Sequence, residues 1–402
     1  MFTSKSKGIH NHIKGLGLDD MGEPIDTEDS IFGQVDARKC LGLVVDMVRS
    51  RMYAGKCFLL AGPSGCGKSA LAVALSEELG TKIPFISISA SELYSSEVKK
   101  TEILEEFLRM AVIVRIKEFK DVYEGEVVNI KDLNIDLRSG KGTKSLKLSK
   151  ELQDQLAYQN VKVGDVIHID SSSGILKRMG RGESHLNDYD LEAERYVPLP
   201  KGEIHKKREF VHETTLHNLD MSNVNPTNQD VLSLVHQIVR YKKSEVTDKL
   251  RRDVNDLVNN YDKADIVPGV LFIDDAHLLD LECFSYLNKA LDSNNSPIII
   301  LSSNIKEGRV RGSEEVSPFG ISEDLLRRLL VISVQKNENE DDIIRSRLSK
   351  EQVDMDEEGL NAIFMLCRKR GLQQAISLIK MFKCVEGKVS LKDVEDVSKL
   401  FN

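Results

Sequence analysis

The chain has 402 residues, 41% of them hydrophobic and 30% charged, a balance that fits a folded globular protein and excludes a disordered one. No apolar run approaches the roughly 18 residues that span a bilayer, and the N-terminal stretch MFTSKSKGIHNHIKG lacks the apolar segment of a secretory signal, so we expect no membrane association. The net charge of −8 excludes an overall field that attracts nucleic acid, so any such binding needs a local basic patch.

The cysteines are scattered and do not form a metal-binding pattern. None stands in a CxxC pair, so the sequence does not predict a zinc site. We expect reduced and mostly buried thiols. The six positions are Cys40, Cys57, Cys66, Cys283, Cys367 and Cys384.

The first part of the chain alternates helical and strand patterns. Residues 1–30 are Gly-rich and polar and predict an extended arm. The elements expected next are a helix over 36–51, a buried strand over 57–62, a helix over 67–80, a strand over 84–90 and a helix over 99–119. This order predicts an α/β domain with a parallel sheet.

A second pattern begins near residue 121. Apolar and polar residues alternate with period two over 123–130, 143–149 and 164–174, and turn residues separate these stretches. The alternation predicts half-buried antiparallel strands in a small barrel or sandwich. Residues 184–230 are polar, with little periodicity.

The α/β pattern returns near residue 246. We expect a charged helix over 246–262, apolar strands over 268–277 and 297–304, and a helix over 322–330 that Ser322 would cap. Beyond Ser333 the pattern is helical, and Ser390 with Asp393 forms a capping box for the last helix.

The segment GPSGCGKS (62–69) matches the pattern G-x-x-x-x-G-K-[ST] between an expected strand and an expected helix. Its glycines let backbone N–H groups turn inward to phosphate oxygens, and the following helix adds its positive end. Lys68 supplies charge for the β- and γ-phosphates of ATP, and Ser69 supplies a Mg²⁺ ligand. Cys66 admits a redox role, but a tolerated small side chain is the simpler interpretation. The predicted nucleotide-binding residues are Gly62, Pro63, Ser64, Gly65, Cys66, Gly67, Lys68 and Ser69.

Polar side chains at two later strand ends complete the predicted catalytic set. Asp274 is expected to hold the Mg²⁺ water shell and Asp275 to polarise the attacking water. Asn304 ends the next strand, where strand ends of a parallel sheet meet the ligand. Arg328 on the 322–330 helix is expected to reach the γ-phosphate of a neighbouring subunit. The alternatives are solvated acids, a turn residue and a solvent-facing arginine.

The distance between the two halves of this site indicates an inserted domain. Lys68 and Asp274 are 274 − 68 = 206 positions apart, which is far more than a compact P-loop domain needs. Residues 121–246 account for the additional length. Basic stretches at 141–150, 176–182 and 205–208 favour either single-stranded DNA or RNA binding or a solvated, protein-docking surface.

Long motifs in this sequence resemble the eukaryotic RuvB-like AAA+ ATPases. The pontin-type branch matches better than the reptin-type, chiefly through YVPLPKG (196–202), NQDVLSL (228–234) and KKSEVTDKLR (242–251). The segments that carry the family resemblance are HNHIKGLGL (10–18), GQVDAR (33–38), LLAGPSGCGKSALA (59–72), RIKEFKDVYEGEV (115–127), YVPLPKGEIHKKRE (196–209), DKLRRDVN (248–255), PGVLFIDDAHLLDLECFSYLNKAL (268–291) and SPFGISEDLLRRLL (317–330).

The resemblance implies a P-loop AAA+ core in residues 1–120 and 247–332, an inserted OB-like β-rich domain in 121–246 and a helical lid in 333–402. It implies hexameric rings of this chain alone or with a reptin-type paralogue. It also implies DNA helicase activity, chromatin-remodelling and Hsp90-linked assembly complexes as partners, and a nuclear location with a cytoplasmic share.

The resemblance also assigns site residues. Lys68, Asp274, Asn304 and Arg328 match the P-loop lysine, acidic-strand, sensor-1 and arginine-finger positions. His10 and His12 match an N-terminal segment near the nucleotide, with a solvated arm as the alternative.

Two positions depart from the family pattern. Asp275 stands where the family has Glu and is one methylene shorter, and Gln373 stands where the family has the sensor-2 arginine. Arg370, one helical turn earlier, is a candidate replacement. We therefore expect slow ATP hydrolysis with nucleotide binding retained. An assembly scaffold controlled by nucleotide fits these departures better than a helicase that acts directly on DNA, and the inserted domain disfavours a clamp-loader subunit.

Overall fold

The computed structural model describes residues 13–19, 21–25, 31–51, 55–131, 134–171, 174–182, 196–224, 246–293, 295–336, 340–382 and 388–400. The chain divides into two compact units. The first comprises Met1–Val114, Thr214–Asn260 and Ile266–Asn402, and the second comprises Arg115–Glu213 and Tyr261–Asp265. The sequence placed the insertion at 121–246, whereas this division groups 214–260 with the first unit.

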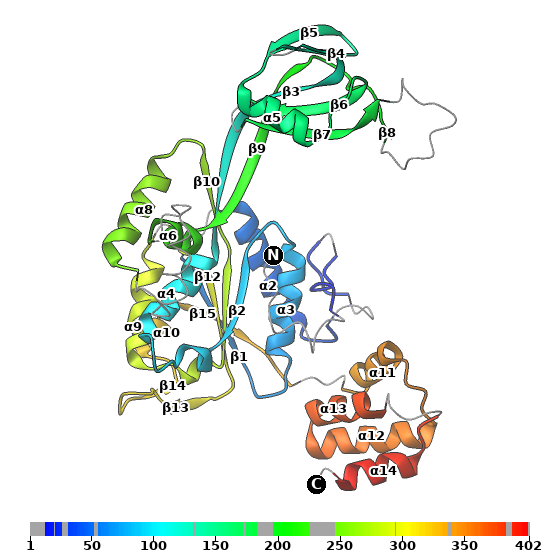
Figure 1. The fold of residues 1–402 in the computed structure, drawn as a ribbon. Coiled ribbons are helices and arrows are strands. Elements are labelled where there is room, and N and C mark those ends of the chain that lie inside the picture. The colour runs from blue at the N-terminus through cyan, green and yellow to red at the C-terminus, as the bar shows by residue number, and fades with distance from the viewer. Residues whose placement is uncertain are drawn as a thin grey trace. The chain divides into compact units, whose positions relative to one another are not determined.

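A five-stranded parallel sheet forms the centre of the first unit. Its strands are β1 (Cys57–Ala61), β2 (Phe85–Ser89), β11 (Val270–Asp274), β12 (Ile298–Ser303) and β15 (Leu329–Ser333). They lie in the order β15-β1-β12-β11-β2, and every pairing is parallel. The predicted α/β domain with a parallel sheet is therefore confirmed (Figure 1).

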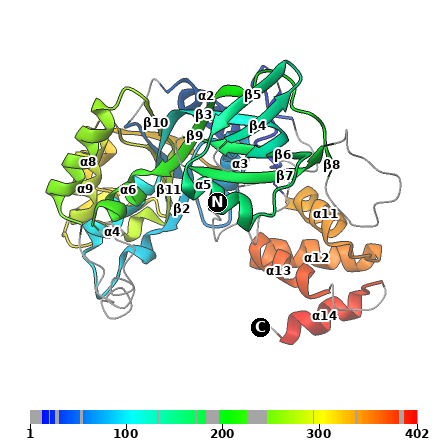
Figure 2. The same ribbon diagram turned by 45° about the horizontal axis from the view of Figure 1, so that its top comes forward.

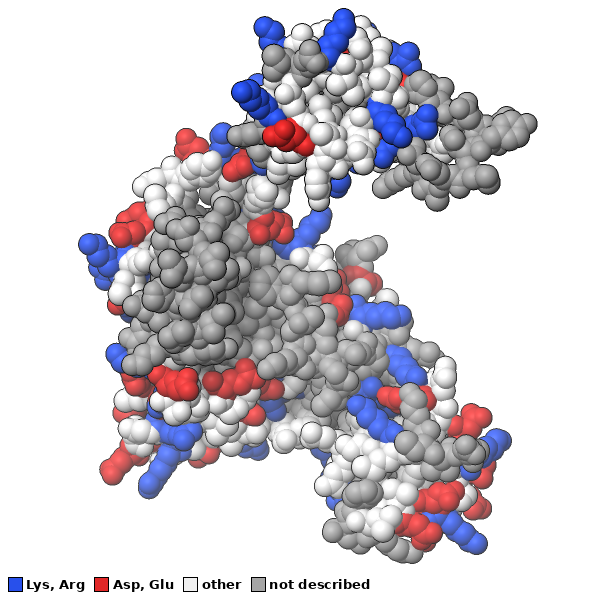
Figure 3. Space-filling model, viewed as in Figure 1, with Lys and Arg blue, Asp and Glu red and all other residues white. Residues whose placement is uncertain are grey.

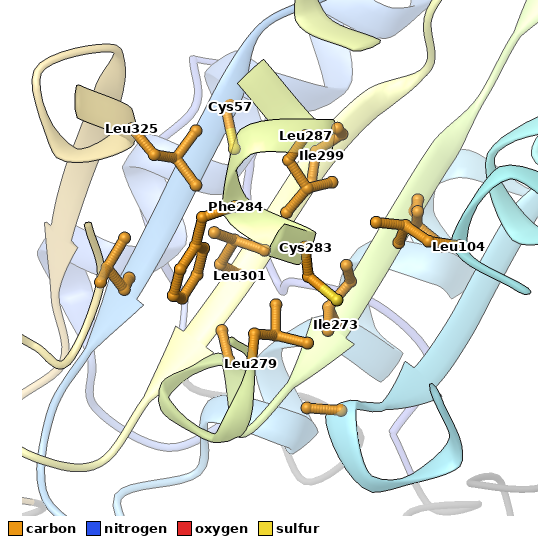
Figure 4. Packing of buried hydrophobic residues seen from close by; sticks show 14 of the residues in the cluster. Cys57, Leu104, Ile273, Leu279, Cys283, Phe284, Leu287, Ile299, Leu301 and Leu325 are labelled. Carbon is orange, nitrogen blue, oxygen red and sulfur yellow. The ribbon is translucent and has the colours of Figure 1, made fainter. Parts of the chain in front are cut away.

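Helices cover both faces of this sheet. Helices α2 (Val35–Ser50) and α3 (Lys68–Leu79) pack on one face, and α4 (Lys100–Met110), α9 (Leu281–Leu291) and α10 (Glu323–Leu326) pack on the other. Side chains alternate between the two cores along each strand, as period two requires. Leu301 packs with Phe284 of α9 in the core that Figure 4 shows, whereas Ile300 belongs to the opposite core.

The carboxyl ends of these parallel strands meet at one edge of the sheet. Ala61, Asp274 and Ser303 each end a strand there, so the segments that follow them are brought together although they are far apart in sequence. The 3-10 helices η1 (Ala90–Leu93) and η3 (Ala276–Leu278) and the hairpin of β13 (Glu307–Arg309) and β14 (Val316–Pro318) follow strands at the same edge.

Two predicted helices were too long. The helix expected over 99–119 ends at Met110, and β3 begins at Val112, because the run Val-Ile-Val favours an extended backbone. The helix expected over 322–330 ends at Leu326, so Arg328 lies between α10 and β15 rather than on a helix. Ser322 does occupy the N-cap position, but its buried hydroxyl makes no hydrogen bond in the described part of the chain, so the predicted cap is wrong.

The second unit is β-rich, as predicted from its period-two pattern. Its principal strands are β3 (Val112–Lys131), β4 (Asn134–Ser139), β5 (Gly142–Lys147), β6 (Asp165–Asp170) and β7 (Ile175–Gly182), in the antiparallel order β5-β4-β3-β6-β7. Helix α5 (Lys150–Tyr158) packs beside β7 (Figures 1 and 2). Strands β8 (Tyr196–Val197), β9 (His205–Thr215) and β10 (Ala264–Pro268) complete the sheet. The OB-like assignment of this unit rests on the resemblance.

Two helices follow the insertion: the first packs against α4, and the second packs against the first. They are α6 (Leu216–Val224) and α8 (Asp248–Asn260). Buried Arg109 of α4 pairs with buried Asp220 of α6 and donates to Asn255 of α8. These contacts explain why residues 214–260 group with the first unit.

The predicted helical C-terminus is confirmed. It consists of α11 (Glu340–Glu351), α12 (Glu357–Arg370), α13 (Leu372–Phe382) and α14 (Leu391–Leu400) around its own apolar core. Before α14 the backbone N–H and the hydroxyl of Ser390 both donate to the Asp393 carboxylate, so one arm of the predicted capping box forms. Within the described residues, no helix is long and apolar enough to cross a membrane.

The predicted extended arm is only partly described. Its Ile13 and Leu16 are buried in the core beside α2 and α3, so this stretch is packed rather than solvated.

Candidate nucleotide site

The loop between β1 and α3 needs glycine for two different reasons. Gly65 and Gly67 have φ of 83° and 92°, in the left-handed region that side chains disfavour. Gly62 instead lies against the next strand's end, where an added Cβ would stand 2.1 Å from the Val334 carbonyl oxygen. The loop is thus shaped by backbone conformation at two positions and by close approach at the third.

Lys68 opens α3 with its side chain folded into this loop. Its Nζ donates to the carbonyl oxygens of Gly62 and Pro63, both at 2.8 Å, and the residue is only 7% exposed. Burial lowers the pKa of this ammonium, while the nearby carboxylates of Asp274 and Asp275 act in the opposite direction. A buried cation at a helix N-terminus, beside a loop shaped by glycines, fits a phosphate group.

Ser69 and Asp274 are in contact although 205 residues separate them. The Ser69 hydroxyl donates to Asp274 Oδ2 at 2.7 Å, and the Ser302 hydroxyl of β12 bonds the other carboxylate oxygen. A hydroxyl and a carboxylate are hard oxygen ligands of the kind that Mg²⁺ takes together with water and phosphate oxygens. The described residues contain no cluster of three or more His, Cys, Asp or Glu side chains that would hold a metal unaided.

Asp275 and Asn304 meet beside this pair. Asp275 has a left-handed backbone, with φ 53° and ψ 46°, and its N–H donates to Asp274 Oδ1 at 3.1 Å and to Ser302 Oγ at 3.2 Å. Asn304 Nδ2 donates to Asp275 Oδ1 at 3.4 Å. The strained residue is thus held from three sides, which is the kind of conformation found at functional sites.

A cavity of about 800 Å³ lies between the phosphate loop and the helical C-terminus. Gln373, at the predicted sensor-2 position, and Arg370, the candidate replacement, both line it together with the loop. They are not one turn apart on one helix as expected, because Arg370 ends α12 and Gln373 lies in α13 after Gly371. Lys336 and Glu340 also line it, and sequence reasoning missed both because they lie outside any motif. Lys336 Nζ stands 3.5 Å from Glu340 Oε1.

Cys66 is buried in the phosphate loop, with 3% of its surface exposed. Burial raises the pKa of its thiol, against the opposing effect of Lys68 and Lys336. A buried thiol that resists ionisation is a poor redox centre, which favours the tolerated small side chain over redox control.

Arg328 is not brought to this site within the chain. Its Nη1 donates to Asp292 Oδ1 at 2.8 Å and to the Asn288 carbonyl at 3.3 Å, both at the end of α9, and the side chain is half exposed. A role on a neighbouring subunit stays a prediction. His10 and His12 lie outside the described residues.

The basic stretches of the second unit are partly neutralised within that unit. Arg178 pairs with buried Asp165, while Arg208 and Lys206 share Glu124. Arg138, just before the first stretch, pairs with buried Glu126. Exposed lysines remain, and Figure 3 shows mostly Lys and Arg among the charged side chains on one face of this unit. They include Lys147, Lys177 and Lys207.

Comparison with known proteins places the chain among relatives of similar length. Residues 6–340 match the TIP49 P-loop domain and residues 343–402 match the TIP49 AAA-lid domain. RuvB-like protein 1 of Encephalitozoon cuniculi is 46% identical, with all of both chains covered. RuvB-like protein 1 of Arabidopsis thaliana is 45% identical over 99% of this chain and 93% of its own length. RuvB-like helicase 1 of Drosophila melanogaster is 43% identical over 98% of this chain and 92% of its own length.

Proposed function

The chain belongs to the TIP49 family of RuvB-like AAA+ proteins, in agreement with the pontin-type resemblance, and on that premise we propose that it binds and slowly hydrolyses ATP. One observation carries the proposal. The Ser69 hydroxyl and the Asp274 carboxylate lie 2.7 Å apart beside the phosphate loop, across 205 residues of sequence. A fold that brings these two oxygens together next to a buried lysine is suited to a magnesium nucleotide.

Each residue of the site has a distinct task. Amides of the glycine-shaped loop bind the phosphates, and the Lys68 ammonium exchanges its two carbonyl partners for phosphate oxygens. Ser69 and Asp274 are the residues that would hold Mg²⁺, which would supply positive charge beside the β- and γ-phosphates. Asp275 orients the attacking water and accepts its proton, and Asn304 holds the Asp275 carboxylate in place.

Two departures support slow turnover. Asp275 is shorter than glutamate, and a general base contributes roughly 10²–10⁴ in rate only when its carboxylate reaches the water. Gln373 lines the cavity without a charge, so Arg370, which lines the same cavity, is the candidate to replace the sensor-2 arginine.

We propose a hexameric ring, of this chain alone or mixed with a reptin-type paralogue, in which Arg328 completes the neighbour's site. The half-exposed position of Arg328 is compatible with such a role. In this proposal the ring serves as a nucleotide-controlled scaffold for chromatin-remodelling and Hsp90-linked assembly complexes, in the nucleus and partly in the cytoplasm.

A helicase acting directly on DNA is the second candidate. Relatives from several organisms carry the name RuvB-like helicase 1, and the second unit exposes lysines that suit a phosphate backbone. The ion pairs that neutralise Arg138, Arg178 and Arg208 weigh against a strong electrostatic groove.

Phosphate release and duplex unwinding, measured in parallel, separate the two candidates. Wild-type protein is compared with Lys68→Ala, each with and without a reptin-type partner. We expect slow release that depends on Lys68, and no unwinding. Equal release by both proteins would contradict the ATPase, whereas unwinding that depends on Lys68 would favour the helicase.

A further inference from the structure

Two consecutive residues before α2 adopt the left-handed backbone conformation. Gly33 has φ 68° and Gln34 has φ 51° and ψ 40°. The region is open to glycine but sterically unfavourable for glutamine. Gln34 stands at the N-cap of α2, yet its side chain makes no capping hydrogen bond, so helix capping does not explain it.

The side chain of Gln34 is directed instead at two backbone carbonyl groups from distant segments. Its Nε2 donates to the Gln335 carbonyl oxygen at 2.5 Å and to the Cys66 carbonyl oxygen at 3.4 Å. Gln335 lies just beyond β15, where the chain leaves the sheet for the helical C-terminus. Cys66 lies in the phosphate loop. One amide group therefore connects the loop to the strand end beside it.

The bond to Cys66 has a geometric consequence for the loop. In a planar trans peptide the C=O and the following N–H point in opposite directions. The carbonyl that faces Gln34 belongs to the peptide between Cys66 and Gly67, so the Gly67 N–H faces away from Gln34. Inward-facing amides are what a phosphate loop requires.

The backbone that carries Gln34 is itself held in place. Arg38 is completely buried, and its guanidinium donates to the Gly33 carbonyl and to the carbonyls of Leu16, Gly17 and Ile25. This network fixes the turn from which the glutamine side chain extends.

We propose that Gln34 is a positioning residue for the nucleotide, which orients the Cys66–Gly67 peptide and ties the phosphate loop to the chain at Gln335. The inference rests on the proposed nucleotide binding and adds a residue that acts through the loop. The motif GQVDAR (33–38) therefore contributes to the site through its glutamine.

The test compares Gln34→Gly with Gln352→Gly in the full-length protein. Gln352 is an exposed glutamine with φ 57°. The control therefore removes the same side chain from a similar backbone conformation, at a position far from the phosphate loop in sequence. Binding of ADP and the ATP turnover parameters are measured for both, and thermal unfolding is followed without nucleotide. Gln34→Asn is a second variant, because asparagine tolerates this conformation but its amide is one methylene short.

We expect Gln34→Gly and Gln34→Asn to bind ADP about tenfold more weakly than wild type, with a matching rise in KM for ATP. The kcat at saturation should stay within about twofold, because the catalytic carboxylates are not touched. Gln352→Gly should match wild type in every binding measurement.

ADP affinity unchanged in both Gln34 variants would overturn the inference, as would a loss that appears equally in Gln352→Gly. A wild-type protein that does not bind ADP at all would instead refute the proposed function, so the two failures are distinguishable.

Discussion

At the scale of single residues, the site combines a rigid loop with a short acid. Gly62, Gly65 and Gly67 have defined steric roles, and Lys68 is buried among backbone carbonyls. Hydrogen bonds from the Asp275 N–H to Asp274 and Ser302 hold its backbone in a left-handed conformation. With the backbone fixed, the length of the Asp275 side chain decides whether its carboxylate reaches the attacking water.

Asp275→Glu is expected to raise kcat by about tenfold or more, because the longer side chain brings the carboxylate to the attacking water. ATP turnover at saturating nucleotide measures this. Asp274→Asn serves as the negative control, since it removes the carboxylate that is expected to hold the Mg²⁺ water shell, and it should abolish turnover. An unchanged or lower rate for Asp275→Glu would count against the argument from reach.

Gly62→Ala is expected to lower the free energy of unfolding by about 2 kcal/mol, because its Cβ would overlap the Val334 carbonyl. It should also abolish nucleotide binding. Gly80→Ala is the matched control, with φ 72° and open space around the added methyl group. That variant should cost about 2 kcal/mol in backbone strain, because Gly80 has φ 72° and ψ −171°, a conformation essentially restricted to glycine, and it should leave binding intact. Urea unfolding and ADP titration measure both; equal binding by the two variants would contradict the account.

At the scale of elements, the sequence predicted best where a local pattern and burial agree. The strand–loop–helix around Lys68 and the strand ending at Asp274 occur where expected, because apolar runs bounded by glycines or acids have one favourable arrangement. The helix expected over 99–119 failed at Val112, where β-branched residues favoured a strand that pairs with distant residues.

Tertiary pairing also explains what the sequence could not reveal. Leu329–Ser333 pairs with β1 to form β15, whereas the helical spacing of Leu325, Leu326 and Leu329 had extended the predicted helix to residue 330. Strand β9 and helix α6 lie in a polar stretch without periodicity, and were not predicted. Contacts such as Gln34 with Gln335 span 301 residues and have no local signal.

We expect the stability of the folded protein to depend on the charge of Asp280, the N-cap residue of α9. Burial acts to raise the pKa of Asp280, but hydrogen bonds from Lys100 and Cys283 outweigh it and hold the pKa below the ordinary value of 3.8. A depressed pKa stabilises the folded state above the unfolded value, and this contribution is lost as the pH falls through the folded value.

Asp280→Asn should therefore lower stability at pH 7 and reduce the further loss of stability on acidification below pH 3.8. Asparagine keeps an N-cap acceptor for the Cys283 N–H, so the change isolates the charge. Denaturant unfolding from pH 7 to pH 2 measures the effect, with Asp253→Asn, at an exposed position of α8, as the control. Parallel pH profiles for wild type and Asp280→Asn would show that the charge is irrelevant.

At the scale of the whole molecule, the insertion divides the site in sequence but not in space. The β-rich unit separates the phosphate loop from Asp274 along the chain, yet the parallel sheet brings them together. Residues 214–260 group with the first unit through buried pairs such as Arg109 with Asp220, which no spacing rule in the sequence indicated.

A mixing experiment tests whether Arg328 acts on a neighbouring subunit. Arg328→Ala and Lys68→Ala should each lose most ATP turnover alone, and Arg328→Ala should still bind ADP. Mixed in one ring, the two variants should recover part of the activity, because a Lys68-intact site can then receive Arg328 from its neighbour. Arg327→Ala, whose side chain pairs with Glu323, is the control that should retain activity. No recovery in verified mixed rings would indicate that Arg328 does not act in trans.

The most direct test of the central claim is calorimetric titration of the assembled protein with ADP and Mg²⁺, for wild type and Lys68→Ala. The account predicts saturable binding by wild type and a loss of at least about tenfold in affinity for Lys68→Ala, because the buried ammonium is the fixed positive charge of the loop. Absence of saturable binding to folded wild-type protein, or equal affinity for both proteins, would contradict it.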